Sequence, residues 1–274
     1  LGDVYKRQIQ EIADSDEIIY TSRAVTSLPH KSGGHIDNWE QDSGDGCYRW
    51  CAPQPQGGLP FGSKSRMILI HLLHTAIANG NPQVMCGDTL YKWNARIQNT
   101  SVGGMTYRII LDHAWRVLRS ELSVENATGD GAIDFGHIAF AEDVNKSNVP
   151  TTIRLSDAFY DHICKNTVPV CYSALQLIKN NSSAIDLYIR LSDGLPKLKS
   201  TRLATWAELK RRFGAGYKNI RQMKPAFLDT LSLVSAVYPQ ARIETREEGV
   251  LLYPSPSSVD HLLQQEQPKL FAAG

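Results

Sequence analysis

The stretch from Thr201 to Pro256 constrains the fold more than any other part of the chain. Thr205 and Glu208 have the spacing of a capping box, which predicts that a helix begins there. Gly214, which can take a positive φ, is expected to end that helix. From Tyr217 the apolar residues return to helical spacing, and ARIETREEGVLLYP then indicates two strands around a turn. Helix, turn, helix and hairpin in this order are the plan of a winged helix.

The first half of the chain has the same order of predicted elements. LPFGSKSRMILIHLLHTAIANG predicts a buried helix capped by Ser63 or Ser65. A short strand in PQVMCGD is followed by predicted helices over 89–98 and 105–121. ELSVENATGDGAIDFGHIAFA predicts a hairpin around residues 128–131. We therefore expect an α+β protein with tandem winged-helix domains, mostly helical and with short β-hairpin wings.

Composition divides the chain into four parts. Residues 1–57 contain SGGH, DSGDG and PQPQGG, which are loop compositions, so we expect a flexible or poorly ordered N-terminal segment. Residues 58–149 would form the first winged-helix domain, and residues 150–256 the second, DNA-binding one. The polar residues 257–274 would form a fraying C-terminal tail.

Charge is unevenly distributed, although the net charge of the chain is only +1. Residues 1–57 carry five lysines and arginines against nine acids, whereas residues 182–224 carry ten against three. These counts give −4 for the first segment and +7 for the second. A basic segment on a helix–turn–helix is typical of a protein that binds the phosphate backbone of double-stranded DNA. The alternative is a solvated helix face, which is what a run of charge usually indicates.

The second helix of the 201–256 unit holds the residues expected to read bases. Arg221 can pair with guanine, and Asn219 or Gln222 can read adenine. Residues 210–212 are expected to contact phosphates, or only to stabilise a helix C-terminus. Two arginines of the hairpin are candidate wing contacts, or plain surface residues. The full set of candidate DNA-binding residues is Arg202, Lys210, Arg211, Arg212, Tyr217, Lys218, Asn219, Arg221, Gln222, Lys224, Arg242, Arg246, Tyr107 and Arg108.

Signals for catalysis or metal binding fail on inspection. Residues 57–65 approach a phosphate-binding loop, but a serine stands where the lysine should follow the second glycine. His71 and His74 lack the glutamate of a zinc-protease helix, and Cys47 and Cys51 lack two further ligands at matching spacing. We expect no catalytic residue, no metal and no cofactor, so the protein is not expected to be an enzyme.

Three observations bear on location. No apolar run approaches the roughly 20 residues that span a bilayer, and the first residues hold no apolar segment of a secretory signal. The five cysteines are scattered and are interpreted as reduced thiols. We expect a cytoplasmic protein with no membrane partner.

Several separated segments resemble one family. LPFGSKSRMILIHLLHTAIANG is similar to a helix of plasmid-encoded RepA-type replication initiators, and the region from AIDLYIRLSDGLPKL to VLLYPSP resembles their C-terminal part. The resemblance extends from Leu59 to Pro256. It implies tandem winged-helix domains that bind repeated sites in a plasmid origin, promote its opening and recruit host replication proteins such as the helicase, with homodimerisation as a further expectation. The chain departs from the family at Pro225, which would kink the second helix or restart it.

Three hypotheses remain at this point. The first is a non-enzymatic plasmid replication initiator that binds double-stranded origin repeats. The second is a winged-helix transcriptional repressor without initiation activity. The third is an enzyme whose site the sequence does not reveal. The tandem units and the resemblance favour the first.

Overall fold

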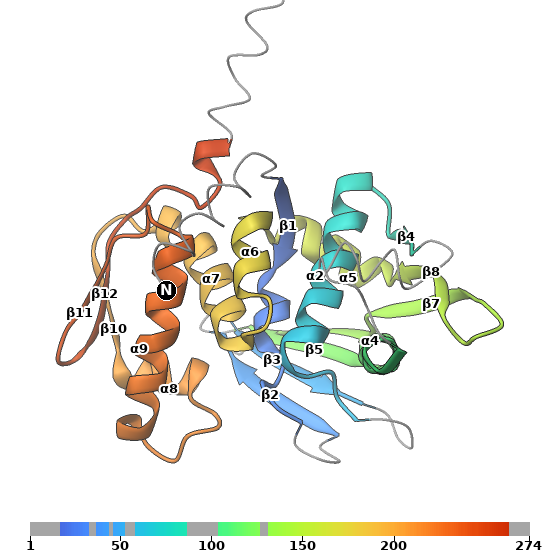
Figure 1. Cartoon of the computed structure of the whole chain (residues 1–274), viewed down its shortest axis with the longest axis horizontal. Helices are drawn as coiled ribbons and strands as arrows, with labels where there is room; N and C mark the ends of the chain where they lie inside the picture. Colours follow the sequence, from blue (N-terminus) through green and yellow to red (C-terminus); the bar gives the residue numbers. More distant parts are fainter. Residues whose placement is uncertain are drawn as a thin grey trace, which may run out of the picture. The chain divides into compact units, whose positions relative to one another are not determined.

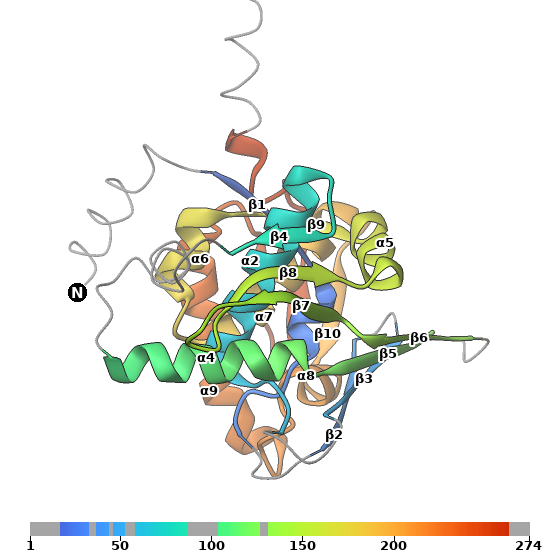
Figure 2. The ribbon, with the colours of Figure 1, turned by 90° about the vertical axis from the view of Figure 1, so that its right-hand side faces the viewer.

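The computed structural model describes residues 17–32, 37–43, 46–52, 58–86, 104–126 and 131–262. The protein is α+β, as predicted, and its three- and four-stranded sheets are antiparallel (Figures 1 and 2). The chain divides into two compact units. We call residues 20–167 with 179–186 the N-terminal unit. Residues 168–178 with 187–274, together with the first 19 residues of the chain, form the C-terminal unit.

Helix α2 (Gly62–Asn79) is buried in the N-terminal unit, as predicted. Leu69, Leu72 and Leu73 have no exposed surface, because apolar residues cover most of its circumference. The predicted serine cap is wrong. The N-cap residue is Phe61 and makes no side-chain capping bond, while the Ser65 hydroxyl accepts a hydrogen bond from the Phe61 N–H at 3.1 Å.

One three-stranded sheet of this unit has the order β4-β8-β7. Its strands are β4 (Gln83–Met85), β7 (Ala139–Val144) and β8 (Pro150–Leu155), each paired antiparallel with its neighbour. Helix α4 (Gly104–Leu118) lies between β4 and β7 in the chain and corresponds to the helix predicted over 105–121. The helix predicted over 89–98 lies outside the described residues.

A second sheet has the order β2-β3-β5-β6, visible edge-on in Figure 2. It consists of β2 (Asn38–Asp42), β3 (Gly46–Cys51), β5 (Glu121–Asn126) and β6 (Ala132–His137). The predicted hairpin is confirmed as β5 and β6, although its turn lies outside the described residues. Strand β5 of this hairpin pairs with β3 and not with β4. The hairpin that forms a sheet with β4 consists of β7 and β8 instead.

The described residues before 58 are ordered, contrary to the expectation of a flexible segment. They form β1 (Ile18–Ser22), the 3₁₀ helix η2 (Arg23–Ser27), β2 and β3. Trp50 of β3 is fully buried and its Nε1 donates to the Ser27 hydroxyl at 2.7 Å. The strands are short and glycines are frequent in the sequence around them, which hides their pattern in a composition-based prediction.

The segment after β8 supplies helix α5 (Asp157–Lys165) to the N-terminal unit. Strand β8 and α5 were expected in the second domain, but β8 pairs with β4 and β7, which places residues 150–167 with the first half of the chain. Strand β9 (Thr167–Cys171) pairs with β1 in a two-stranded sheet. Helices α6 (Tyr172–Ile178) and α7 (Ser182–Gly194) follow.

The rest of the C-terminal unit follows the predicted order of elements. After the 3₁₀ helix η3 (Leu195–Lys197), strand β10 (Arg202–Thr205) leads into α8 (Trp206–Phe213) and then α9 (Ile220–Val237). Strands β11 (Ile243–Thr245) and β12 (Gly249–Leu252) complete a sheet of order β10-β12-β11 (Figure 1).

Aromatic side chains hold α8 and α9 together. Phe227 of α9 packs against Trp206 and Phe213 of α8, with ring centroids 6.0 Å and 5.6 Å apart. In the predicted tail, Val259 and Leu262 are buried, so the described part of it packs onto the unit. Within the described ranges, no helix combines the length and apolar character needed to cross a membrane.

Candidate nucleic-acid interface

Helix α8 begins with the predicted capping box. The Thr205 hydroxyl accepts a hydrogen bond from the Glu208 N–H at 3.3 Å, and the Glu208 carboxylate accepts one from the Thr205 N–H at 2.9 Å. This second bond holds the pKa of Glu208 below its usual value, with help from Arg202 and Arg212. The cap fixes the first turn of α8 and thereby places residues 210–212 in its last turn.

Gly214 ends α8, as predicted, but for a different reason. Its φ is −107°, so positive φ is not what requires glycine here. A Cβ at this position would lie 2.6 Å from the Lys210 carbonyl oxygen and 2.8 Å from the Met223 sulfur. The missing side chain therefore allows α9 to approach the end of α8 closely.

Helix α9 begins at Ile220, three residues later than Tyr217. Asn219 is its N-cap, and the Asn219 side-chain oxygen accepts a hydrogen bond from the Gln222 N–H at 3.0 Å. That oxygen is therefore engaged in capping, which leaves the Asn219 amide NH₂ as the group that can meet a base. Arg221 and Gln222 lie in the exposed first turn.

Pro225 neither breaks nor restarts α9, which runs without interruption from Ile220 to Val237. The ring of Pro225 is exposed and lies in the second turn of the helix. Proline offers no N–H to the carbonyl of Arg221, four residues before it. The hydrogen bond from residue 225 is therefore missing beside the exposed cations of the first turn.

Six cations gather at the end of α8, in the turn and at the start of α9. We call them the α8–α9 patch. No acidic residue occurs between Leu209 and Leu228. Within the described parts of the chain, no carboxylate lies at salt-bridge distance from Lys218 or Arg221. The patch consists of Lys210, Arg211, Arg212, Lys218, Arg221 and Lys224; of these, Arg211, Lys218 and Arg221 are exposed and the others partly so.

Trp206 is a positioning residue that the sequence did not single out. The Lys224 Nζ lies 4.6 Å from the centre of the Trp206 ring, a cation–π distance. The indole N–H of Trp206 donates to the Glu247 carbonyl at 2.8 Å, and its backbone N–H donates to the Glu248 carbonyl at 3.1 Å. One buried side chain thus connects α8, a patch lysine and the hairpin turn.

Each of the three candidate cations on the sheet has a partner nearby. Arg202 lies 3.3 Å from a Glu208 oxygen, and Arg246 lies 2.9 Å from a Glu244 oxygen. Arg242 stacks over the Tyr253 ring at 5.5 Å. The β11–β12 turn also carries Glu247 and Glu248, so its tip is acidic. Tyr217 is exposed and does not belong to this hairpin, because it lies in the turn between α8 and α9.

The remaining two candidates belong to the N-terminal unit. Arg108 is exposed on α4. Tyr107 lies in the same helix, but its side chain is outside the described residues. The structure therefore gathers most of the candidates in the C-terminal unit around α8 and α9, and these two on a separate helix.

Nothing in the described residues resembles a metal centre. No group of three or more histidine, cysteine, aspartate or glutamate side chains within these ranges could hold an ion. All five cysteines are thiols rather than disulfides. Burial raises the pKa of the Cys47 and Cys51 thiols, which disfavours the thiolate form that zinc requires.

An α+β protein with six cations and no acid between Leu209 and Leu228, where two helices meet, is a candidate nucleic-acid-binding protein. The family model of the plasmid-encoded RepA protein matches residues 59–208, more than half of the chain. The chain therefore belongs to the plasmid-encoded RepA family of replication initiators, as its sequence resemblance indicated. No curated protein gives a significant match.

Crystal structures of domains 2 and 3 of RctB have a similar fold. A selenomethionine derivative matches with a TM-score of 0.54 and 11% identity, over 86% of this chain and 96% of that chain. A second structure of these domains matches with a TM-score of 0.50 and 9% identity, over 84% and 94% of the two chains. At such identities the likeness concerns the fold alone.

Proposed function

We propose that this protein initiates plasmid replication by binding repeated double-stranded DNA sites in the plasmid origin and promoting the opening of the adjacent DNA. It would act in the bacterial cytoplasm as a binding protein without an enzymatic activity. The observation that carries the proposal is the α8–α9 patch, because six cations without an intervening acid match the charge of a phosphate backbone. Membership of the RepA family supports the role in replication.

We propose further that each unit contains a winged helix. In the C-terminal unit the sheet order β10-β12-β11 places the strand before α8 next to the last strand of the hairpin. The N-terminal unit repeats this order as β4-β8-β7, with α2 before β4 and α4 before the β7–β8 hairpin. Residues 87–103, which would hold the missing helix, are outside the described residues.

Within the C-terminal unit, α9 is the proposed recognition helix. Arg221 and Gln222 point from its first turn, the part of a recognition helix that reaches base edges. The cations of α8 would contact phosphates and fix the register without selecting sequence. The acidic tip of the β11–β12 hairpin and its paired arginines support a smaller contribution from the wing.

The proposal is tested by replacing Arg221 with alanine and measuring fluorescence anisotropy on an origin repeat and on a scrambled duplex. We expect binding to the repeat to weaken by about 1–3 kcal/mol and the preference over the scrambled duplex to decrease. Arg202→Ala is the matched control, because Arg202 is exposed but paired with Glu208. Equal losses for both variants, or none for Arg221→Ala, would argue against α9 as the reading helix.

Origin opening needs its own measurement, because a repressor would bind the same DNA. Permanganate reactivity of thymines beside the repeats should rise when the protein is added to a supercoiled plasmid. Binding without opening would assign the protein to transcriptional repression instead. Helicase recruitment and homodimerisation are further parts of the proposal. They are measured by co-purification with the host helicase and by sedimentation at several concentrations.

A further inference from the structure

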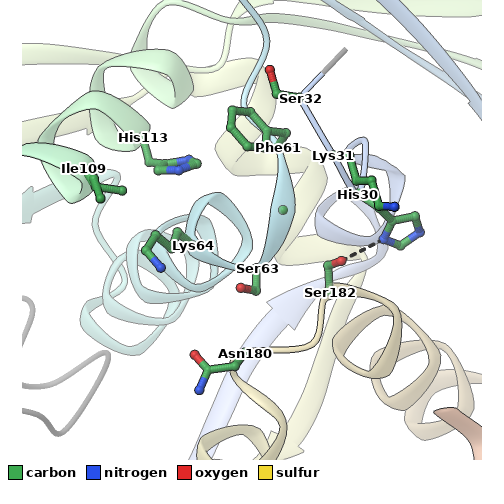
Figure 3. Close-up of a pocket in the computed structure, with 11 residues that line it drawn as sticks. His30, Lys31, Ser32, Phe61, Ser63, Lys64, Ile109, His113, Asn180 and Ser182 are labelled. Atoms are coloured by element: carbon green, nitrogen blue, oxygen red, sulfur yellow. Dashed lines mark hydrogen bonds between the residues drawn. The ribbon is translucent and has the colours of Figure 1, made fainter. Parts of the chain in front are cut away.

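The N-terminal unit contains an open cavity of about 470 Å³ that the proposed DNA reading does not use. Four segments that are distant in sequence form its walls, and Figure 3 shows their side chains. They are the chain after η2, the start of α2, the middle of α4 and the chain around the start of α7. Its polar lining includes His30, Lys31, Ser63, Lys64, Asn180 and Ser182.

The lining is cationic and rich in hydroxyl groups. Lys31 and Lys64 supply two positive charges, and none of the described residues that line the cavity is acidic. Asp186 lies just behind the wall, 3.6 Å from His30, but it is 1% exposed and forms a 2.7 Å ion pair with Arg66. Its charge is therefore neutralised inside the protein and does not offset the lysines.

Hydroxyl and amide groups lie between these charges. Ser63 of α2 and Ser182 of α7 lie between Lys64 and His30 in Figure 3, and the Ser182 hydroxyl is 3.0 Å from His30 Nδ1. Exposed Asn180 adds an amide at the rim. These groups can donate hydrogen bonds to oxygen atoms of a ligand that the lysines attract.

The start of α2 adds to the positive potential. No side chain caps this helix, and its first turn carries no acid. Lys64 stands in that turn, where a positive charge opposes the helix dipole and costs stability. A bound anion would offset this cost, since helix N-termini and lysines both attract negative charge.

Hydrogen bonds behind the cavity join two of the segments that form its walls. The Arg66 guanidinium donates to the carbonyls of Pro29 and Gly62, at 3.1 Å and 3.0 Å, so the segments that carry His30 and Ser63 are joined through one side chain. Gly62 has a φ of 69°, a conformation that favours glycine, and its N–H donates to the Pro29 carbonyl at 2.9 Å. The backbone segments that carry Lys31, Ser63 and Lys64 are therefore joined to each other before any ligand arrives.

We propose that this cavity binds a phosphate group through Lys31, Lys64, Ser63 and Ser182. The phosphate comes either from a small phosphorylated molecule or from the backbone of a DNA duplex, and the same side chains serve both. The inference does not rest on the proposed reading of DNA by α9, because no residue of the α8–α9 patch takes part.

The test is titration calorimetry of the full chain with inorganic phosphate at constant ionic strength. We expect the double variant Lys31→Ala/Lys64→Ala to bind phosphate at least tenfold more weakly than the wild type. Lys146→Ala/Lys165→Ala is the matched control, because both lysines are exposed in the same unit and neither lines the cavity. Ser182→Ala, which keeps both lysines, should weaken phosphate binding by a smaller factor.

A second arm distinguishes the two sources. The same variants are tested for binding to a duplex of mixed sequence. A parallel loss of duplex affinity assigns the site to backbone phosphate, whereas unchanged duplex affinity assigns it to a small phosphorylated molecule. The proposal is overturned if the wild type shows no heat of phosphate binding, or if the cavity and control variants bind phosphate equally well.

Discussion

Arg66 is a fully buried guanidinium whose five N–H groups are all used. It donates twice to Asp186, both at 2.7 Å, and to the backbone carbonyls of Leu28, Pro29 and Gly62. Burying such a charge is costly unless every donor has a partner. The arrangement thus explains why an arginine stands inside the apolar helix α2, where the hydrophobic pattern alone offers no reason for it.

Removing one member of this pair should destabilise the N-terminal unit. We expect Arg66→Ala to lower the free energy of unfolding by about 3–5 kcal/mol, because Asp186 would keep a buried charge without its counterion. Urea unfolding followed by circular dichroism measures the change. The double variant Arg66→Met/Asp186→Leu should lose less than Arg66→Ala. A larger loss for the double variant would contradict this account.

His113 makes stability dependent on pH in the acid range. It is buried on α4, its Nδ1 lies 2.8 Å from the Ser65 hydroxyl, and its ring packs on Phe61. Burial lowers the pKa of His113 from 6.5 to about 4; Asp112 opposes the shift, and Arg116 and Lys64 add to it. Between these two pKa values the unfolded chain binds the proton and the folded protein does not, so stability falls as pH decreases.

The expected change is on the order of 1.4 kcal/mol for each pH unit within that window. Urea unfolding at about pH 5 and about pH 6.5 should therefore give a clear difference for the wild type. The variant His113→Gln should show a smaller difference, since glutamine does not titrate. An equal pH dependence in both proteins would assign the effect to carboxylates elsewhere in the chain.

At the scale of elements, helix α9 must satisfy two demands at once. Its buried side holds Met223, Phe227 and Leu231, whereas its first turn must leave Arg221 exposed. Pro225 lies between these regions and removes one intrahelical hydrogen bond. The helix remains continuous because the aromatic contacts with α8 hold it from the buried side.

Replacing Pro225 with alanine should stabilise the C-terminal unit. Alanine restores the bond to the Arg221 carbonyl and has the higher helix propensity, although the unfolded chain gains freedom. We expect a net gain of about 1–2 kcal/mol in thermal or urea unfolding. Ala226→Gly, one residue later, is the matched control and should lose about 1 kcal/mol. A loss of stability in Pro225→Ala would mean that the proline fits α9 better than alanine does.

Local signals predicted individual elements well. The capping box of Thr205 and Glu208 and the β5–β6 hairpin both depend on residues close in sequence. Pairing between distant strands was not predictable in the same way. β8 was assigned to the wrong half because nothing in Pro150–Leu155 specifies that its partner is β4, nearly 70 residues earlier.

Distant contacts also limited what the sequence could predict about the candidate site. The sequence showed a cluster of basic residues near α8 and α9. It did not show which basic residues form ion pairs or cation–π contacts in the fold. The ion pairs of Arg202 and Arg246 and the Trp206 contact with Lys224 depend on strand register and on the hairpin turn. The cavity lined by Lys31 and Lys64 is built from four separated segments, so no local pattern could indicate it.

At the scale of the whole molecule, charge is separated along a chain that is nearly neutral. The net charge is +1, yet the interval from Leu209 to Leu228 carries six cations and no acid. Long-range attraction to DNA by the whole chain is therefore small, and binding depends on cations held close to phosphates. This arrangement predicts a strong dependence on salt despite the low net charge.

Each phosphate that a cation neutralises contributes about −0.9 to the slope of log affinity against log salt concentration. Six patch cations in contact would give a slope of roughly −5, a loss of about a thousandfold from about 50 to about 200 mM salt. Fluorescence anisotropy on an origin repeat at several salt concentrations measures this slope. The double variant Lys218→Ala/Arg221→Ala should reduce its magnitude by roughly 2, whereas Arg246→Ala should change it less, because Glu244 already neutralises Arg246. A slope near zero, or an equal change in both variants, would show that the patch does not supply the phosphate contacts.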